Sequence, residues 1–193
     1  MEAPAYPLPR AGLLLAGLGA ALVLRLAVAG GAGVYSVPAG IIFAAVLLAV
    51  AGAAGWRPGR PRLTGFLICL AGAGVLVAVP LWLRLSGAVE PLSFPLAGFL
   101  PWALVVSAVA VGEELLLRGI LFTLVQRVAG PITATGITAI AFGLLHVPLY
   151  GWHVLPLDLA VGVWLGGLRV VSGGVTAPAV AHTLADLAAW WLV

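Results

Sequence analysis

Residues 97–127 read AGFLPWALVVSAVAVGEELLLRGILFTLVQR, an almost unbroken apolar run that carries Glu113, Glu114 and Arg118 in its second half. The run exceeds the roughly 20 apolar residues that one membrane-spanning helix needs. We therefore expect a tilted or kinked membrane helix, or one preceded by an interfacial piece near Pro101. Because charged side chains are costly in lipid, the three ionisable residues predict that this helix faces the interior of a helix bundle.

The rest of the chain is equally apolar. Of its 193 residues, 63% are hydrophobic and only 8% are charged, whereas a soluble domain carries about 25% charged residues. The composition predicts an all-α fold, a polytopic membrane helix bundle of about seven transmembrane helices, with about three of them in residues 1–96 and the remainder in 97–193. The expected helices cover residues 11–30, 37–55, 63–84, 97–127, 131–149, 155–171 and 175–193.

The formal net charge of +3 comes from arginines, since the chain has no lysine. Arg57, Arg60 and Arg62 lie between two apolar runs, as in a cytoplasmic loop, so nucleic-acid binding is not indicated. A cytoplasmic N-terminus puts most of the arginines between the helices on the inside, which fits the positive-inside rule. A signal peptide at residues 1–29 is the competing interpretation, but Arg25 interrupts its apolar core.

Aromatic residues support the same orientation. With the N-terminus inside, an aromatic belt at the outer interface would be formed by Tyr35, Trp82, Trp102, Tyr150, Trp152, Trp190 and Trp191. The lipid bilayer is thus an expected partner of this chain.

The ionisable residues of the long apolar run differ in their expected partners. Glu114 and Arg118 are four residues apart on one helix face, so we expect an internal ion pair with a structural role. Glu113 points about 100° away around the helix. The positions three and four residues after it are leucines, so its partner must come from another helix.

Two further motifs follow along the chain. Phe142 and His146 are separated by one helical turn, and His182 and Asp186 are also four residues apart. A hydrogen bond between His182 and Asp186 would fix the orientation of the imidazole ring. One carboxylate, two histidines and an orienting aspartate could meet inside a bundle, where they could either activate water or hold a divalent metal.

Taken together, these motifs resemble those of the CPBP intramembrane proteases, the family of the type II CAAX prenyl proteases, also called the Abi family. The resemblance covers 97–193, and the helices of 1–96 are similar only in being apolar. It implies that Glu113 and His146 activate the attacking water, while His182 and Asp186 stabilise the oxyanion. Glu114, Arg118 and Phe142 would then support the site.

One position departs from the family pattern, because Asp186 stands where the family often has asparagine. An ionised aspartate accepts hydrogen bonds but donates none, so we expect Asp186 to orient or charge His182, or to be itself protonated. The resemblance leaves two mechanisms open. One is driven by glutamate without a metal, and the other uses a divalent metal such as zinc, held by Glu113, His146 and His182.

The resemblance predicts an intramembrane endopeptidase that cleaves near the membrane-associated end of a protein or peptide substrate. We expect a multi-pass protein of a bacterial plasma membrane, and the sequence says nothing of its oligomeric state. A transporter or proton-relay protein, or an inactive immunity or scaffold protein, is the alternative. His153, Asp158 and the Gly162-x-x-x-Gly166 pattern are interpreted as structural features.

Overall fold

The computed structural model describes residues 9–29, 36–56, 63–88 and 98–192, and all the regular structure in them is helical. Arg57, Arg60, Arg62 and Tyr35, which entered the prediction of topology, lie outside these residues. The elements run α1 (Pro9–Ala29), α2 (Val37–Ala53), α3 (Leu63–Leu85), α4 (Phe99–Glu114), the π-helix η3 (Leu115–Leu121), α5 (Phe122–Tyr150), the short 3-10 helix η4 (Trp152–Val154), α6 (Leu155–Ser172) and α7 (Thr176–Leu192).

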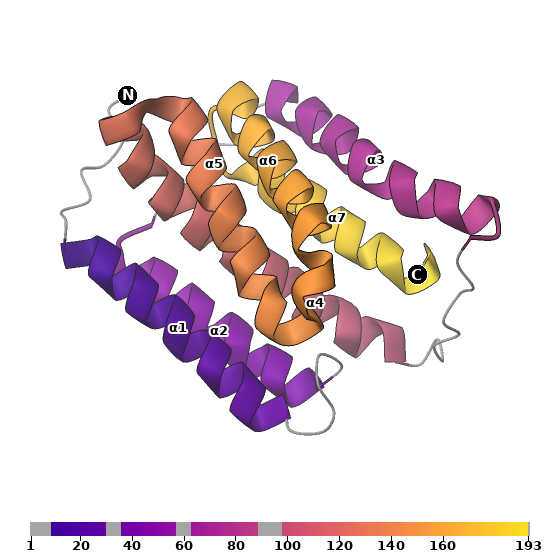
Figure 1. Ribbon diagram of the computed structural model, residues 1–193, viewed down its shortest axis with the longest axis horizontal. Helices are drawn as coiled ribbons and strands as arrows, with labels where there is room; N and C mark the ends of the chain where they lie inside the picture. Colours follow the sequence, from indigo (N-terminus) through magenta and orange to yellow (C-terminus); the bar gives the residue numbers. More distant parts are fainter. Residues whose placement is uncertain (1–8, 30–35, 57–62, 89–97, 193) are drawn as a thin grey trace.

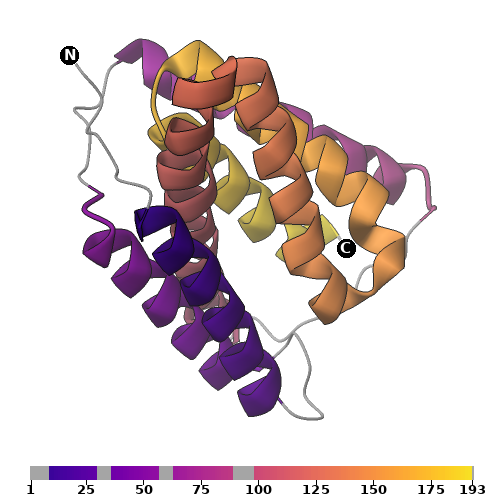
Figure 2. The same ribbon diagram turned by 60° about the vertical axis from the view of Figure 1, so that its left-hand side comes forward.

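The helices pack as pairs around α4. Helix α1 lies along α2, α5 along α6, and α3 along α7. Helix α4 contacts both α2 and α7, so it runs through the middle of the molecule between the α1–α2 pair and the C-terminal helices (Figures 1 and 2). The polar residues of α4 are therefore enclosed on several sides, as the sequence predicted.

The long apolar run contains a helical irregularity and ends in a sharp bend. After Glu114 the helix widens into the π-helix η3 and then continues as the first part of α5. At Gly130 the backbone has φ 80° and ψ 171°, a conformation that only glycine adopts readily. Pro131 then begins the next helical part, because proline fits the first turn of a helix. The break lies where the sequence predicted the boundary between residues 97–127 and 131–149.

Small residues allow α5 and α6 to approach closely. A Cβ atom added to Gly162 would lie 2.7 Å from the Cα of Ala139, and one added to Gly166 would lie 2.7 Å from the side chain of Thr135. The Gly162-x-x-x-Gly166 pattern, interpreted from the sequence as a structural feature, lets α6 pack closely against α5 of the same molecule.

Three helical segments are long and apolar enough to cross a membrane: Gly12–Ala29, Leu67–Leu85 and Trp152–Ser172. Their outward faces carry large apolar side chains, such as Leu15, Trp82 and Val163, with exposed fractions of 66%, 66% and 52%. In water such a surface would be unfavourable, whereas lipid tails solvate it well. The molecule is an integral membrane protein; the predicted number of about seven spans is not confirmed.

Aromatic rings gather where α4 begins and α7 ends. The ring centroids of Trp102 and Trp190 are 4.7 Å apart, and Phe99 lies between 5.5 and 6.0 Å from the rings of Trp102, Trp190 and Trp191. This cluster contains three of the residues that the sequence assigned to one aromatic belt. Which side of the membrane it faces stays a prediction.

Candidate active site

A cavity of about 250 Å³ lies between the central helices. The four residues predicted to be catalytic, Glu113, His146, His182 and Asp186, all line it, and they come from α4, α5 and α7. Helices α1 and α2 complete the wall with Arg25, Val37 and Gly40, together with Ser36, which precedes α2. The structure thus brings the predicted residues to one place; the roles assigned to them remain a prediction.

The ion pair predicted between Glu114 and Arg118 is present and fully buried. Arg118 Nη1 donates to Glu114 Oε1 at 2.6 Å, and both side chains are 0% exposed. Arg118 Nη2 donates to the main-chain oxygen of Gly162 at 3.1 Å, and its guanidinium lies 4.8 Å from the ring centroid of Phe142. Arg118 of η3 therefore contacts three other elements, α4, α6 and α5.

The π-helix places Arg118 within reach of another arginine. Arg169 Nε of α6 donates to the main-chain oxygen of Arg118 at 3.0 Å, and its guanidinium lies 5.2 Å from the ring of Phe122. Because π-helical turns alter the usual backbone pairing, they often occur at functional sites. The sequence indicated neither the π-helix nor this contact.

His146 is held by its neighbours in one tautomer. Its Nδ1 lies 2.9 Å from the main-chain oxygen of Phe142. A carbonyl oxygen can only accept, so Nδ1 carries the hydrogen and donates it. In the neutral ring, Nε2 is then left with a free lone pair. Phe142 and Tyr150 pack on the imidazole, with ring centroids 4.5 and 5.8 Å away.

His182 lies between two carboxylates. Its Nδ1 is 3.1 Å from Glu114 Oε1, and its Nε2 is 3.6 Å from Asp186 Oδ2. The contact with Asp186 follows from their spacing on one helix, but at 3.6 Å it is an ion-pair contact and not the predicted hydrogen bond. The contact with Glu114 spans α4 and α7 and was not predicted. Glu114 therefore supports His182 directly, in addition to its ion pair with Arg118.

Glu113 lacks, among the described residues, the partner on another helix that the sequence predicted. Its side chain is buried, with 2% exposed, but no hydrogen bond or salt bridge links it to another residue of the described chain. It lines the cavity together with His146 and Asp186 instead of pairing with another helix. A carboxylate in this position can contact water or a substrate that enters the cavity.

Arg25 and Tyr150 are cavity residues whose part in the site the sequence did not reveal. Arg25 was visible as a charge inside an apolar run, but its helix lies outside the resemblance. Tyr150 was interpreted as part of the aromatic belt.

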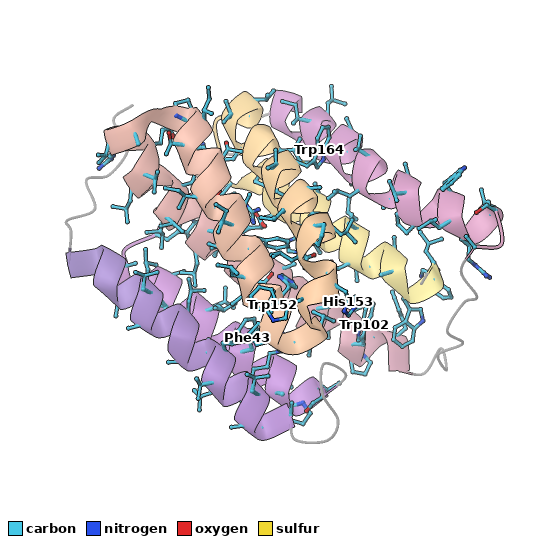
Figure 3. The ribbon with its side chains drawn as sticks, in the orientation of Figure 1. Phe43, Trp102, Trp152, His153 and Trp164 are labelled. Carbon is cyan, nitrogen blue, oxygen red and sulfur yellow. The ribbon has the colours of Figure 1, made fainter. Side chains whose placement is uncertain are left out.

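In the view of Figure 3, Phe43 and Trp102 lie on either side of the turn at Trp152 and His153 that joins α5 to α6.

The predicted metal ligands have the chemistry of a zinc site but not its arrangement. Within the described ranges, no three His, Cys, Asp or Glu side chains are grouped so that they could hold a metal ion. His182 Nδ1 lies on Glu114 and its Nε2 faces Asp186 Oδ2 at 3.6 Å, and the predicted ligands Glu113, His146 and His182 are not gathered around one point. A structural or catalytic zinc ion needs at least three protein ligands. This side-chain arrangement therefore does not fit a three-ligand metal site.

The C-terminal part of the chain is similar to a known protein family. Residues 95–188 match the family described as type II CAAX prenyl endopeptidase Rce1-like. The matched segment contains all four of the residues predicted to be catalytic, whereas α1, α2 and α3 precede it. Searches of curated proteins and of solved structures found no match.

Proposed function

We propose, from the match of residues 95–188 to the type II CAAX prenyl endopeptidase Rce1-like family, that the protein is an intramembrane endopeptidase. It would hydrolyse a peptide bond near the membrane-associated end of a protein or peptide substrate. The observation that carries the proposal is the common cavity of Glu113, His146 and His182, three ionisable residues from three helices of the matched segment. Ionisable side chains inside a membrane cost free energy, so their presence there indicates a function.

Glu113 and His146 would activate the attacking water. His146 has its Nδ1 hydrogen engaged by Phe142, so its Nε2 is the atom that can accept a proton. The Glu113 carboxylate, which lacks a partner among the described residues, would hold the same water by accepting its second hydrogen. The water oxygen then attacks the substrate carbonyl carbon, while its proton moves to one of these two groups. That group returns the proton to the leaving amine.

His182 would stabilise the oxyanion. The carboxylates of Glu114 and Asp186 on its two sides favour the imidazolium form, in which both nitrogens carry hydrogens. Nδ1 would remain on Glu114, while Nε2 would donate to the oxygen of the tetrahedral intermediate. Asp186 would orient and charge His182, because an ionised carboxylate cannot itself donate to an oxyanion.

The substrate would be a membrane-anchored protein or a peptide that enters laterally from lipid or through a water-filled opening. Hydrolysis at this depth requires water, and the cavity, which Glu113, His146 and His182 line, provides a place for it. A prenylated substrate is not expected if the source is bacterial. We place the protein in a bacterial plasma membrane with its N-terminus in the cytoplasm, because this orientation satisfies the arginine distribution.

A comparison of membrane-protein C-termini and released peptides by mass spectrometry tests this function. Cells would carry the wild-type protein, Glu113→Ala, or His153→Ala, which changes a histidine exposed at the α5–α6 turn and outside the cavity. We expect new termini with the wild-type protein and His153→Ala but none with Glu113→Ala. Identical termini in all three strains, at equal expression, would favour the transporter or the non-enzymatic protein.

Metal dependence needs a separate measurement. We expect purified, active protein to keep its activity after exhaustive treatment with a chelator, because its described donors do not form a three-ligand site. Stoichiometric zinc in the active protein, with activity lost on removal and restored on addition, would establish the metal-dependent mechanism instead.

A further inference from the structure

Arg25 is a buried cation in the wall of the cavity. Its side chain is 8% exposed, and it lines the same cavity as Glu113 and Tyr150. It belongs to α1, which precedes the matched segment 95–188. The chemistry assigned to the four predicted catalytic residues does not use it.

Arg25 has no anionic partner among the described residues. Its guanidinium lies 4.8 Å from the ring centroid of Phe43, which is fully buried, and it forms no salt bridge. The cation–π contact orients the guanidinium group of Arg25, but the aromatic ring does not neutralise its charge. Arg118, the other buried arginine described above, has both a carboxylate and a carbonyl oxygen.

Of the groups that line the cavity with Arg25, Glu113 and Asp186 are acidic, whereas the N-terminal end of α2 favours an anion. Ser36 caps the N-terminus of α2, accepts from the N–H of Ala39, and lines the cavity. The N-terminal end of α2 thus contributes partial positive charge to the wall near Arg25. Glu113 lies on α4 in the same wall without contacting Arg25, so a bound molecule can reach both residues.

We propose that Arg25 is a substrate-binding residue that holds a carboxylate of the peptide substrate inside the cavity. The inference rests on the proposed function and deepens it, because it names a chemical group that the substrate must carry. A guanidinium fork matches the two oxygens of a carboxylate, so it can form two parallel charge-assisted hydrogen bonds. That carboxylate is either the C-terminus of the chain or an acidic side chain near it.

Binding without cleavage separates this proposal from the proposed function. The Glu113→Gln protein, reconstituted in neutral phosphatidylcholine vesicles, would be titrated with the dansyl-labelled peptide Leu-Gln-Val-Leu as the free acid and as the C-terminal amide. A third probe, Leu-Glu-Val-Leu amide, has its only carboxylate in a side chain. Affinities obtained in this way can be interpreted even if no peptide is ever cleaved.

We expect one of the two carboxylate peptides to bind about tenfold more tightly than the neutral amide, the size expected for hydrogen bonds between charged groups. In Arg25→Gln this preference should disappear, while Arg25→Lys should keep part of it. Preference for the free acid would identify the C-terminus as the ligand, and preference for the glutamate peptide would identify a side chain. Arg84→Gln, at the end of α3 and outside the cavity, is the matched control and should keep the full preference.

Two results would overturn the proposal. One is equal binding of all three peptides to the protein that retains Arg25, a result that needs no Arg25 variant to fold. The other is a carboxylate preference that persists in folded Arg25→Gln, as judged by an unchanged thermal unfolding midpoint.

Discussion

The α1–α2 pair and the C-terminal helices α4–α7 differ in the kinds of side chain that they bury. The buried residues of α1 and α2 are almost all apolar, for example Leu14, Phe43 and Leu47. The C-terminal helices and η3 bury apolar residues too, but they also bury the polar side chains of Glu113, Glu114, Arg118, Thr123, Thr138 and His182. Apolar contacts permit many helix rotations of similar energy, whereas a buried ion pair demands one geometry. The C-terminal helices are therefore positioned for chemistry, and the N-terminal pair mainly closes the cavity.

Arg25 is the exception within the N-terminal pair, and it faces the cavity that the C-terminal helices form. The difference between the two regions can be tested by substitutions in each. Substitutions should lower catalytic activity only at Arg25 and at the polar residues of the C-terminal helices. In both regions, the loss of unfolding free energy should depend on which buried contact the substitution removes.

The largest effect should come from the residues that face the cavity. We expect Glu113→Ala or His146→Ala to lower cleavage at least about 100-fold, because each removes a group that would accept or hold the proton of water. The protein should still insert and fold, as checked by size-exclusion chromatography and thermal unfolding. Full activity in either variant would show that the residue does not activate water.

The next effect concerns the buried ion pair. Glu114→Ala leaves Arg118 buried without its carboxylate and removes a partner of His182, so the unfolding free energy should fall by about 3–5 kcal/mol. Folded yield should drop at least as much as the specific activity of the folded fraction. A well-folded but inactive Glu114→Ala would move Glu114 into the catalytic set.

In the N-terminal pair, Leu14→Ala should reduce the unfolding free energy in mild detergent by about 2–3 kcal/mol. This is the lower end of the usual range, because lipid or detergent already solvates apolar groups. Leu14 is 2% exposed, whereas its neighbour Leu15 is 66% exposed and provides the matched control. Leu15→Ala should change stability little, and both variants should keep full specific activity. Lost activity in folded Leu14→Ala would contradict the separation of the two regions.

The smallest effect is expected where α5 and α6 approach. Gly162→Ala places a Cβ atom 2.7 Å from the backbone of Ala139 and should cost about 1–3 kcal/mol. Gly167→Ala on the same helix meets nothing within 4 Å and should be neutral or slightly stabilising. Equal thermal unfolding midpoints for the two variants would show that the α5–α6 contact relaxes freely.

Several features of the fold and site could be predicted from particular residues. The bend at Gly130 follows from a glycine before a proline, and the Glu114–Arg118 pair follows from spacing on one helix. The π-helix η3 could not be predicted, because its residues other than Gly119 are good formers of an ordinary α-helix and no local pattern marks a π-turn. The absence of a partner for Glu113 among the described residues was also missed, since a sequence does not show how far a neighbouring helix stands away.

The sequence by itself determined that the chain is an apolar helical membrane protein, where most helices begin and end, and which ionisable residues share a helix face. These properties depend on composition and on local periodicity, which a reader of the sequence can count. Only the tertiary structure decided that Glu114 contacts His182 and that Arg25 of α1 faces the cavity of Glu113. Such contacts join residues far apart in the chain, and they depend on how each helix is rotated and packed against its neighbours.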